Sequence, residues 1–251
     1  YWDFVSGNDQ KATASDRTLF DLGLRPRQVL GFSLAAFAVA ALIGGYVVVA
    51  WGGSIDLLVL FAVGALLAFF YTAEPVRLKA RALGDLTILL CYGPLPLLGV
   101  FFMQTGRWEW LVPGLLSLAP GLLAVAILHA NNTRDLDKDR RSRTLTVARL
   151  LGSVANCRRF YIALIALAYV AVALVGLLLL LSSRQLPGGT VGVGQSLLLL
   201  GMSLLALPLA LRLVRNFEAG VRADTIVEQT AQFHLAFGVL LLVGLLLLPR
   251  L

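Results

Sequence analysis

The sequence is poor in charged residues and in cysteine. Of its 251 residues only 14% are charged and 59% are hydrophobic, and the mean hydropathy is +0.84. A soluble domain does not have this composition, whereas a helical protein that crosses a membrane several times does. The two cysteines, Cys91 and Cys157, form no metal-binding pattern, which argues against a disulfide framework. The chain also lacks an initial methionine and a signal peptide, so we expect its natural start to lie upstream of Tyr1.

The sequence contains seven long apolar runs. Each is long enough, or nearly so, to cross a bilayer as a helix, and proline is expected to kink two of them, at Pro94 with Pro96 and at Pro208. The seven runs are 29–51, 57–73, 86–103, 110–130, 160–181, 190–211 and 233–248. They predict an all-α fold, a polytopic transmembrane helical bundle with seven spans in a single domain over 1–251.

The basic residues indicate an orientation. If the spans alternate, 18 of the 21 Lys and Arg residues fall on the side of the N-terminus and three on the other. The positive-inside rule then places the N-terminal side in the cytosol. This topology explains the net charge of +7 without a nucleic-acid partner, and it places the strongly charged loops on one face of the membrane.

The most polar segment beside an apolar run is 131–140, with the sequence NNTRDLDKDR. Carboxylates and carboxamides are costly at the mouth of a membrane helix, which indicates a function. If the helix continues, Asn131, Asp135 and Asp139 are four residues apart, and Asn132 shares their face. Such a row of hard oxygen ligands predicts a bound Mg²⁺ with a phosphate completing its coordination.

The same segment has a simpler interpretation. It can be a plain polar helix end, in which the acids pair with Lys138 and Arg140 at helical spacing. Asp137 points away from the acidic row and is expected to be solvated.

A second acidic pair, Asp3 and Asp9, lies in the N-terminal stretch. Six residues on a helix turn through about 240°, so the two would not share a helical face. Gly7 offers a point where the helix ends and the backbone turns back, which would bring Asp9 towards Asp3. With the first cluster on the same side of the membrane, the pair suggests two cations around one polyanionic group, although solvated aspartates are the alternative. Candidate counter-charges for that group are Arg17, Lys79, Arg134 and Arg140.

Two aspartate-rich motifs on the cytosolic side of a helical membrane protein resemble the UbiA superfamily of intramembrane aromatic prenyltransferases. The second motif is similar to that of its naphthoquinone branch, which serves menaquinone and vitamin K biosynthesis. The matching segments are 3–9 with 16–19 for the first motif and its loop, 71–72, Lys79, 82–86 and 93–95 for the middle region, and 126–135 with 139–140 for the second motif. The resemblance covers nearly the whole chain.

The resemblance implies Mg²⁺-dependent transfer of a polyprenyl group from its diphosphate to a naphthoquinol-type aromatic acceptor. Mg²⁺ would neutralise the charge on the departing diphosphate, and the bundle would keep water from the allylic cation. The implied partners are polyprenyl diphosphate, the aromatic acceptor and membrane lipid, with no nucleic acid. The implied catalytic acids are Asp3, Asp9, Asp135 and Asp139; these with Asn132 are the metal ligands, and Arg17, Lys79, Asn131, Asn132 and Arg140 bind the diphosphate.

Histidine offers one further candidate. His129 lies three residues before Asn132, so it could face the site, but the preferred interpretation is a polar residue near a helix end. His234 stands alone in the last span and receives no role.

The number of spans departs from the family. Nine transmembrane helices are expected from the resemblance, and the sequence has seven apolar runs. The resemblance implies a first motif that begins with an Asn four residues before the position matching Asp3, and the position of that Asn lies off the chain. We therefore expect a nine-helix fold that here lacks its first helix and most of its second.

Other functions remain open from the sequence. Within the superfamily, the acceptor can instead be 4-hydroxybenzoate or homogentisate, and a non-catalytic member would bind prenyl diphosphate and regulate a partner. A cation transporter or channel would place charges in mid-span and show matching halves, whereas these acids lie at span ends. We expect an integral multi-pass protein whose acidic motifs face the cytosol, in the endoplasmic reticulum or Golgi, a plastid or a bacterial plasma membrane.

Overall fold

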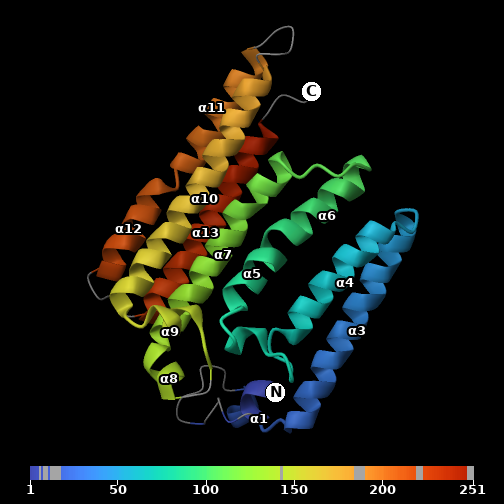
Figure 1. Ribbon diagram of the computed structural model, residues 1–251, viewed down its shortest axis with the longest axis vertical. Coiled ribbons are helices and arrows are strands. Elements are labelled where there is room, and N and C mark those ends of the chain that lie inside the picture. Colours follow the sequence, from blue (N-terminus) through green and yellow to red (C-terminus); the bar gives the residue numbers. More distant parts are fainter. Residues whose placement is uncertain are drawn as a thin grey trace. The chain divides into compact units, whose positions relative to one another are not determined.

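The computed structural model describes residues 1–5, 7, 11, 18–141, 144–183, 190–218 and 223–247. Within these ranges the regular structure is helical, with no β-strand (Figure 1). By their contacts the residues divide into two compact units, 1–81 and 82–251. The helices are α1 (Trp2–Val5), α2 (Thr18–Asp21), α3 (Pro26–Ala50), α4 (Ile55–Phe70), the 3-10 turn η1 (Leu78–Ala80), α5 (Gly84–Tyr92), α6 (Pro94–Thr105), α7 (Val112–Arg134), α8 (Leu136–Arg141), α9 (Val147–Leu151), α10 (Val154–Ser183), α11 (Thr190–Leu204), α12 (Leu207–Glu218) and α13 (Ala223–Leu246).

The predicted polytopic helical bundle is confirmed. In the described residues, six helical stretches are long and apolar enough to cross a membrane, and the shorter apolar helix α4 takes the place of the second predicted span. The cytosolic orientation of the acidic motifs and the single domain over 1–251 stay predictions.

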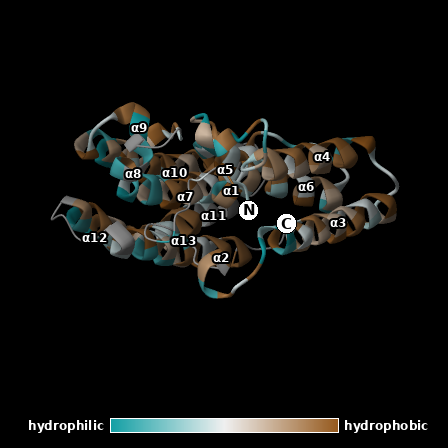
Figure 2. Cartoon of the chain, turned by 90° about the horizontal axis from the view of Figure 1, so that it is seen from below, coloured by the Kyte–Doolittle hydropathy of each residue, from teal (hydrophilic) through white to brown (hydrophobic). Residues whose placement is uncertain are grey.

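The first unit is built on a hairpin of α3 and α4. Gly52 and Gly53 form its turn with φ values of 79° and 69°, a left-handed conformation that glycine adopts without a Cβ clash. A Cβ at Gly44 would lie 2.1 Å from the ring of Phe61, so this glycine gives the ring its space between the helices. Both helices are hydrophobic along most of their surface (Figure 2), as lipid-facing helices are.

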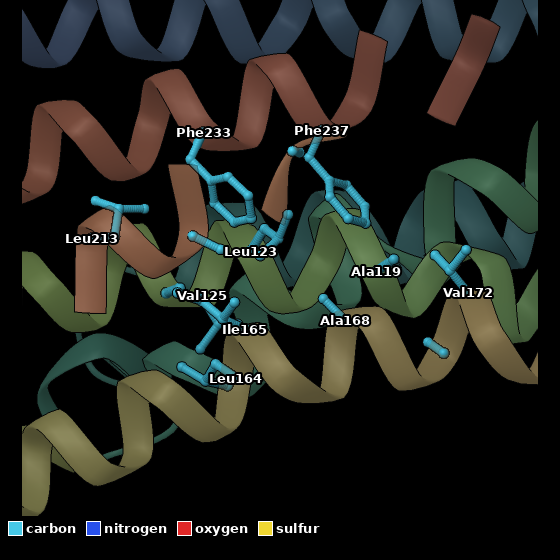
Figure 3. Close-up of a cluster of buried hydrophobic side chains, with 14 of the residues drawn as sticks. Ala119, Leu123, Val125, Leu164, Ile165, Ala168, Val172, Leu213, Phe233 and Phe237 are labelled. Atoms are coloured by element: carbon cyan, nitrogen blue, oxygen red, sulfur yellow. The ribbon is translucent and has the colours of Figure 1, made fainter. Parts of the chain in front are cut away.

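The second unit is organised around α7. In the most apolar stretch of α7 half of the residues are buried, compared with 6% of the residues in the corresponding stretch of α3. Helices α10 and α13 run beside it (Figure 1), and their side chains interlock with its own (Figure 3). The labelled core comes from α7 (Ala119, Leu123, Val125), α10 (Leu164, Ile165, Ala168, Val172), α12 (Leu213) and α13 (Phe233, Phe237).

The predicted kink at Pro94 and Pro96 is present as a break between α5 and α6 at Gly93. There the chain crosses α7 with backbone against backbone. A Cβ at Gly93 would lie 2.8 Å from the carbonyl oxygen of Ser117, and a Cβ at Gly121 would lie 2.9 Å from that of Leu89. Only glycine permits this crossing, which fixes the end of α5 against α7.

The last two spans differ from their predicted bounds. Helix α11 ends at Leu204, before Pro208, and α12 continues to Glu218. Helix α13 begins at Ala223, ten residues before the predicted start. The prediction missed these residues because the first turns of the helix are polar and do not belong to the apolar run. Polar residues of the two helices contact each other there, since the Asn216 side-chain amide donates to Gln229 Oε1 at 2.7 Å.

Candidate functional site

Asp3 lies in the first turn of α1, in the first unit. Its Oδ2 accepts a hydrogen bond from Lys79 Nζ, 76 residues away in sequence. Its Oδ1 lies 3.9 Å from the guanidinium of Arg77. The three side chains are 16 to 28% exposed, so partial burial strengthens the attraction between the charges.

The loop after α4 presents the two cations to Asp3. The backbone N–H of Lys79 donates to the Tyr71 carbonyl at 3.0 Å, and that of Arg77 donates to the Ala73 carbonyl at 2.9 Å. Arg77 has a φ of 46°, which is uncommon for a residue with a Cβ. Its guanidinium also donates to Glu74 Oε1 at 3.1 Å. We call Asp3, Glu74, Arg77 and Lys79 the Asp3 cluster.

A cavity of about 160 Å³ lies beside Asp3 in the same unit. Asp3 supplies an acidic wall, and the rest of the lining comes from α1, α3, the end of α4 and the residues after it. The other lining residues are Tyr1, Trp2, Leu30, Ser33, Leu34, Phe37, Ala68, Phe69, Thr72 and Ala73. The cavity is therefore largely apolar and aromatic, with charge at one wall.

In the second unit, the acidic row begins where α7 ends. Asp135 is the residue at which the helix stops, with φ −88° and ψ 8°, so the helix does not run unbroken through the row. The backbone nevertheless keeps helical spacing. Asp135 N–H donates to the Asn131 carbonyl at 3.1 Å, and Asp139 N–H donates to the Asp135 carbonyl at 2.8 Å. We call Asn131, Asn132, Asp135 and Asp139 the Asp135 segment.

The side chains of this segment have local partners. The Arg134 guanidinium donates to both oxygens of Asp135, at 2.8 and 3.0 Å. Asn131 and Asn132 are half-buried, and Asp137 is exposed as predicted. Hydrophilic residues gather on α8, which follows Asp135 and contains Asp139 (Figure 2).

Asp139 is held from the following helix, α9. The Thr146 hydroxyl donates to Asp139 Oδ2 at 3.4 Å and accepts from the backbone N–H of Arg149 at 3.2 Å, as the N-cap of α9. The Arg149 guanidinium donates to the carbonyl of Asp139 at 3.2 Å and to that of Thr144 at 2.7 Å. These bonds tie the end of the Asp135 segment to α9.

A small buried cluster lies under the segment. Leu136, Ala148 and Cys157 pack together at 4, 0 and 0% exposure, and the Cys157 thiol donates to the Ala148 carbonyl at 3.5 Å. The residue after Asp135 is thus anchored to α9 and α10. Cys91 and Cys157 both carry free thiols.

His129 does not face a site in this structure. It is fully buried, its Nε2 lies 3.0 Å from the Cys157 carbonyl oxygen, and its Nδ1 lies 3.9 Å from Asp85 Oδ2. His234 lies within α13.

The structure thus brings together some of the predicted site residues. Asp3 and Lys79 meet in the first unit, and Asn131, Asn132, Asp135 and Asp139 follow one another in the second. Asp9 and Arg17 lie outside the described residues, as does the side chain of Arg140. In the part of the chain that the structure describes, no three His, Cys, Asp or Glu side chains are close enough to form a metal cage.

Sequence reasoning missed Arg77, Thr146 and Asp85 as residues around these acids. For Arg77 a signal was present, because it lies two residues before Lys79 in the same basic loop. For Thr146 the signal was a threonine at the start of a helix, a typical N-cap position. Asp85 precedes an apolar run, but its partner lies 44 residues away, so only the fold reveals it.

Comparison with known proteins matches residues 1–222 to the UbiA prenyltransferase family. The chain is similar to UbiA prenyltransferase domain-containing protein 1 of Dictyostelium discoideum, with 30% identity over 98% of this chain and 70% of that protein. It is 34% identical to the homologue of Drosophila melanogaster, over 97% of this chain and 62% of that protein. The protein of Homo sapiens is 28% identical, over 99% and 68%. No solved structure matches the chain.

Proposed function

The chain belongs to the UbiA prenyltransferase family, and we propose that it transfers a polyprenyl group from a diphosphate to a naphthoquinol-type acceptor, as in menaquinone (vitamin K) biosynthesis. Family membership supports prenyl transfer as the general activity. The acceptor is proposed from the Asn-Asn-Thr-Arg-Asp run at 131–135, which resembles the naphthoquinone branch.

One observation carries the proposal at the level of the site. Asn131, Asp135 and Asp139 keep helical spacing through two consecutive backbone hydrogen bonds, although the helix itself ends between them. This break gives the row a bend, and Leu136 anchors the bend in a buried cluster. A plain polar helix end would need no such anchoring.

The donors of both clusters suit Mg²⁺, which prefers carboxylate and amide oxygens. This ion is commonly held by one or two carboxylates together with water and substrate phosphate, rather than by an all-protein cage. Clusters with few carboxylates therefore fit it. We propose that Asp3 and Asp9, and separately Asn132, Asp135 and Asp139, hold Mg²⁺, which when bound neutralises the charge that develops on the diphosphate.

The chain's own residues then have distinct roles. In the Asp3 cluster, Lys79 and Arg77 lie against Asp3; we propose that Lys79 turns part of its hydrogen bonding to a phosphate oxygen when the diphosphate binds. Arg17 and Arg140 are proposed as further phosphate contacts, and Asn131 as an amide donor. The apolar cavity beside Asp3 is proposed to hold the isoprene carbons next to the diphosphate and to exclude water from them.

The test supplies geranylgeranyl diphosphate and a reduced naphthoquinone to the protein in lipid nanodiscs, with Mg²⁺ or with EDTA. Mass spectrometry detects the prenylated ring. We expect product with Mg²⁺ and none with EDTA.

Other acceptors in the same assay separate the remaining possibilities. Product with 4-hydroxybenzoate or homogentisate, and none with naphthoquinol, would keep prenyl transfer and overturn the acceptor class. Mg²⁺-dependent binding of the diphosphate without product from any acceptor would favour a regulator that senses prenyl diphosphate.

A further inference from the structure

Two buried polar side chains of the second unit face each other away from the acidic row. Asp85 lies in the first turn of α5 with its side chain 11% exposed, and His129 lies in α7 with its side chain fully buried. Asp85 Oδ2 and His129 Nδ1 are 3.9 Å apart, and among the described residues neither atom has a hydrogen-bond partner. Buried polar atoms are costly to leave unpaired, and here two such atoms lie 3.9 Å from each other.

The second polar contact of His129, with the Cys157 carbonyl, determines which ring nitrogen carries a proton. Its Nε2 lies 3.0 Å from the Cys157 carbonyl oxygen, and because a carbonyl only accepts, Nε2 must donate. In a neutral ring Nδ1 is then an acceptor, and in a charged ring it is a donor. Asp85 can pair with it in either case, as a carboxylic acid or as a carboxylate, so one shared proton would make a hydrogen bond once the two atoms, now 3.9 Å apart, move closer.

The pair connects three helices to the acidic row. Asp85 belongs to α5, His129 to α7 and Cys157 to α10. Cys157 is itself buried against Leu136, the residue after Asp135, and against Ala148 of α9. A continuous series of contacts thus runs from the start of α5, through His129, to the bend of the Asp135 segment.

We propose that Asp85 and His129 form a hydrogen-bonded positioning pair that holds the Asp135 segment in the geometry needed to bind Mg²⁺ and diphosphate. The proposal rests on the proposed function, because it assigns the pair a role in that site. His129 touches no substrate, since it is fully buried, and Asp85 acts through it. The pair fixes where α7 ends relative to α5 and α10, and with it the direction of the Asn131, Asn132 and Asp135 side chains.

The variants separate the hydrogen bond from the charge. Asp85→Asn keeps a donor, because its amide N–H can pair with neutral Nδ1, whereas Asp85→Leu keeps only similar bulk. His129→Phe keeps the ring and its edge contact with Phe160 but loses both nitrogens. Thr87→Val is the matched control: Thr87 is a buried polar residue of the same helix, 4% exposed, whose hydroxyl donates to the carbonyl of Leu83, the N-cap residue of α5.

The experiment measures Mg²⁺-dependent binding of inorganic pyrophosphate to the protein in nanodiscs, together with the KM of each substrate and the thermal unfolding temperature. We expect Asp85→Leu and His129→Phe to weaken pyrophosphate binding at least 10-fold and to raise the KM for the prenyl diphosphate similarly, with the KM of the acceptor unchanged. Asp85→Asn should restore binding to within threefold of the wild type, and Thr87→Val should bind as the wild type does.

Three outcomes would overturn the pair's role. Unchanged pyrophosphate binding in folded Asp85→Leu would show that the pair has no positioning role. Binding by Asp85→Asn as weak as that of Asp85→Leu would assign the effect to the carboxylate charge instead of the hydrogen bond. Equal losses in Thr87→Val would reduce the effect to general destabilisation. Absence of Mg²⁺-dependent binding in the wild-type protein itself would instead refute the proposed function, so the two failures are distinguishable.

Discussion

The two acidic clusters hold their carboxylates in different ways. In the Asp3 cluster the carboxylate is paired with Lys79, 76 residues away in sequence. In the Asp135 segment the carboxylate of Asp135 is paired with Arg134, its immediate neighbour. The first arrangement depends on the tertiary structure of its unit, and the second is largely a property of one helix end.

This difference shows where each cluster is vulnerable. The Asp3 cluster depends on a loop in which Arg77 has a left-handed backbone conformation. It also depends on cationic side chains that lie against Asp3, of which Lys79 is proposed to bind the substrate diphosphate. The Asp135 segment depends on packing beneath the bend, through the contacts of Leu136 with Ala148 and Cys157. Substitutions in the first should change substrate binding, and substitutions under the second should change stability.

The largest expected effect is the loss of the Asp135 carboxylate. Asp135→Asn removes a charge that holds Mg²⁺ against the departing diphosphate, and losing one such stabilising group lowers kcat by about 10²–10³-fold. Asp137→Asn is the matched control, because Asp137 is an exposed acid two residues away. Steady-state product formation checks both, and equal activity in the two variants would remove Asp135 from the site.

A smaller loss is expected for Lys79. Lys79→Ala removes a charged hydrogen bond worth about 1.5–3 kcal/mol, so kcat/KM for the prenyl diphosphate should fall by roughly 10- to 150-fold. The acceptor KM should not change. If Lys79→Ala instead alters only the unfolding temperature, the Asp3–Lys79 pair is structural.

The crossing of α5 and α7 tests the packing of α7 within the second unit. Gly121→Ala would place a Cβ 2.9 Å from the Leu89 carbonyl oxygen, and such overpacking costs about 1–3 kcal/mol. Gly114→Ala in the same helix meets nothing within 4 Å and should be neutral or slightly stabilising. Thermal unfolding in detergent compares the two, and similar midpoints would contradict the close crossing.

The smallest effect is expected for the local partner. Arg134 and Asp135 are 23 and 28% exposed, and pairs of this kind contribute about 0.2–1 kcal/mol. Arg134→Gln should therefore lower kcat/KM by less than about fivefold, in contrast to Lys79→Ala. A loss as large as that of Lys79→Ala would show that the two clusters do not differ in the way proposed.

The sequence predicted most of the fold because hydropathy marks lipid-crossing helices directly. It placed the break at Pro94 and the acidic row at the end of α7. It missed the first ten residues of α13, because these turns are polar and begin before the apolar run at Phe233.

The contacts of the site were less predictable. Helical spacing could relate Asn131, Asp135 and Asp139, because they belong to one segment. It could not show that Lys79 reaches Asp3 or that Asp85 faces His129, since both pairs join residues far apart in sequence. These contacts are products of helix packing, which residue patterns do not encode.

The most direct test of prenyl transfer is a single-turnover experiment. Labelled geranylgeranyl diphosphate is mixed with excess protein, Mg²⁺ and a reduced naphthoquinone, and both diphosphate release and prenylated product are followed. We predict equal amounts of the two from the wild-type protein, and formation of both at a rate about 10²–10³-fold lower in Asp3→Asn and Asp135→Asn. Absence of diphosphate release from the wild type, or transfer at the wild-type rate by both variants, would contradict the proposed function.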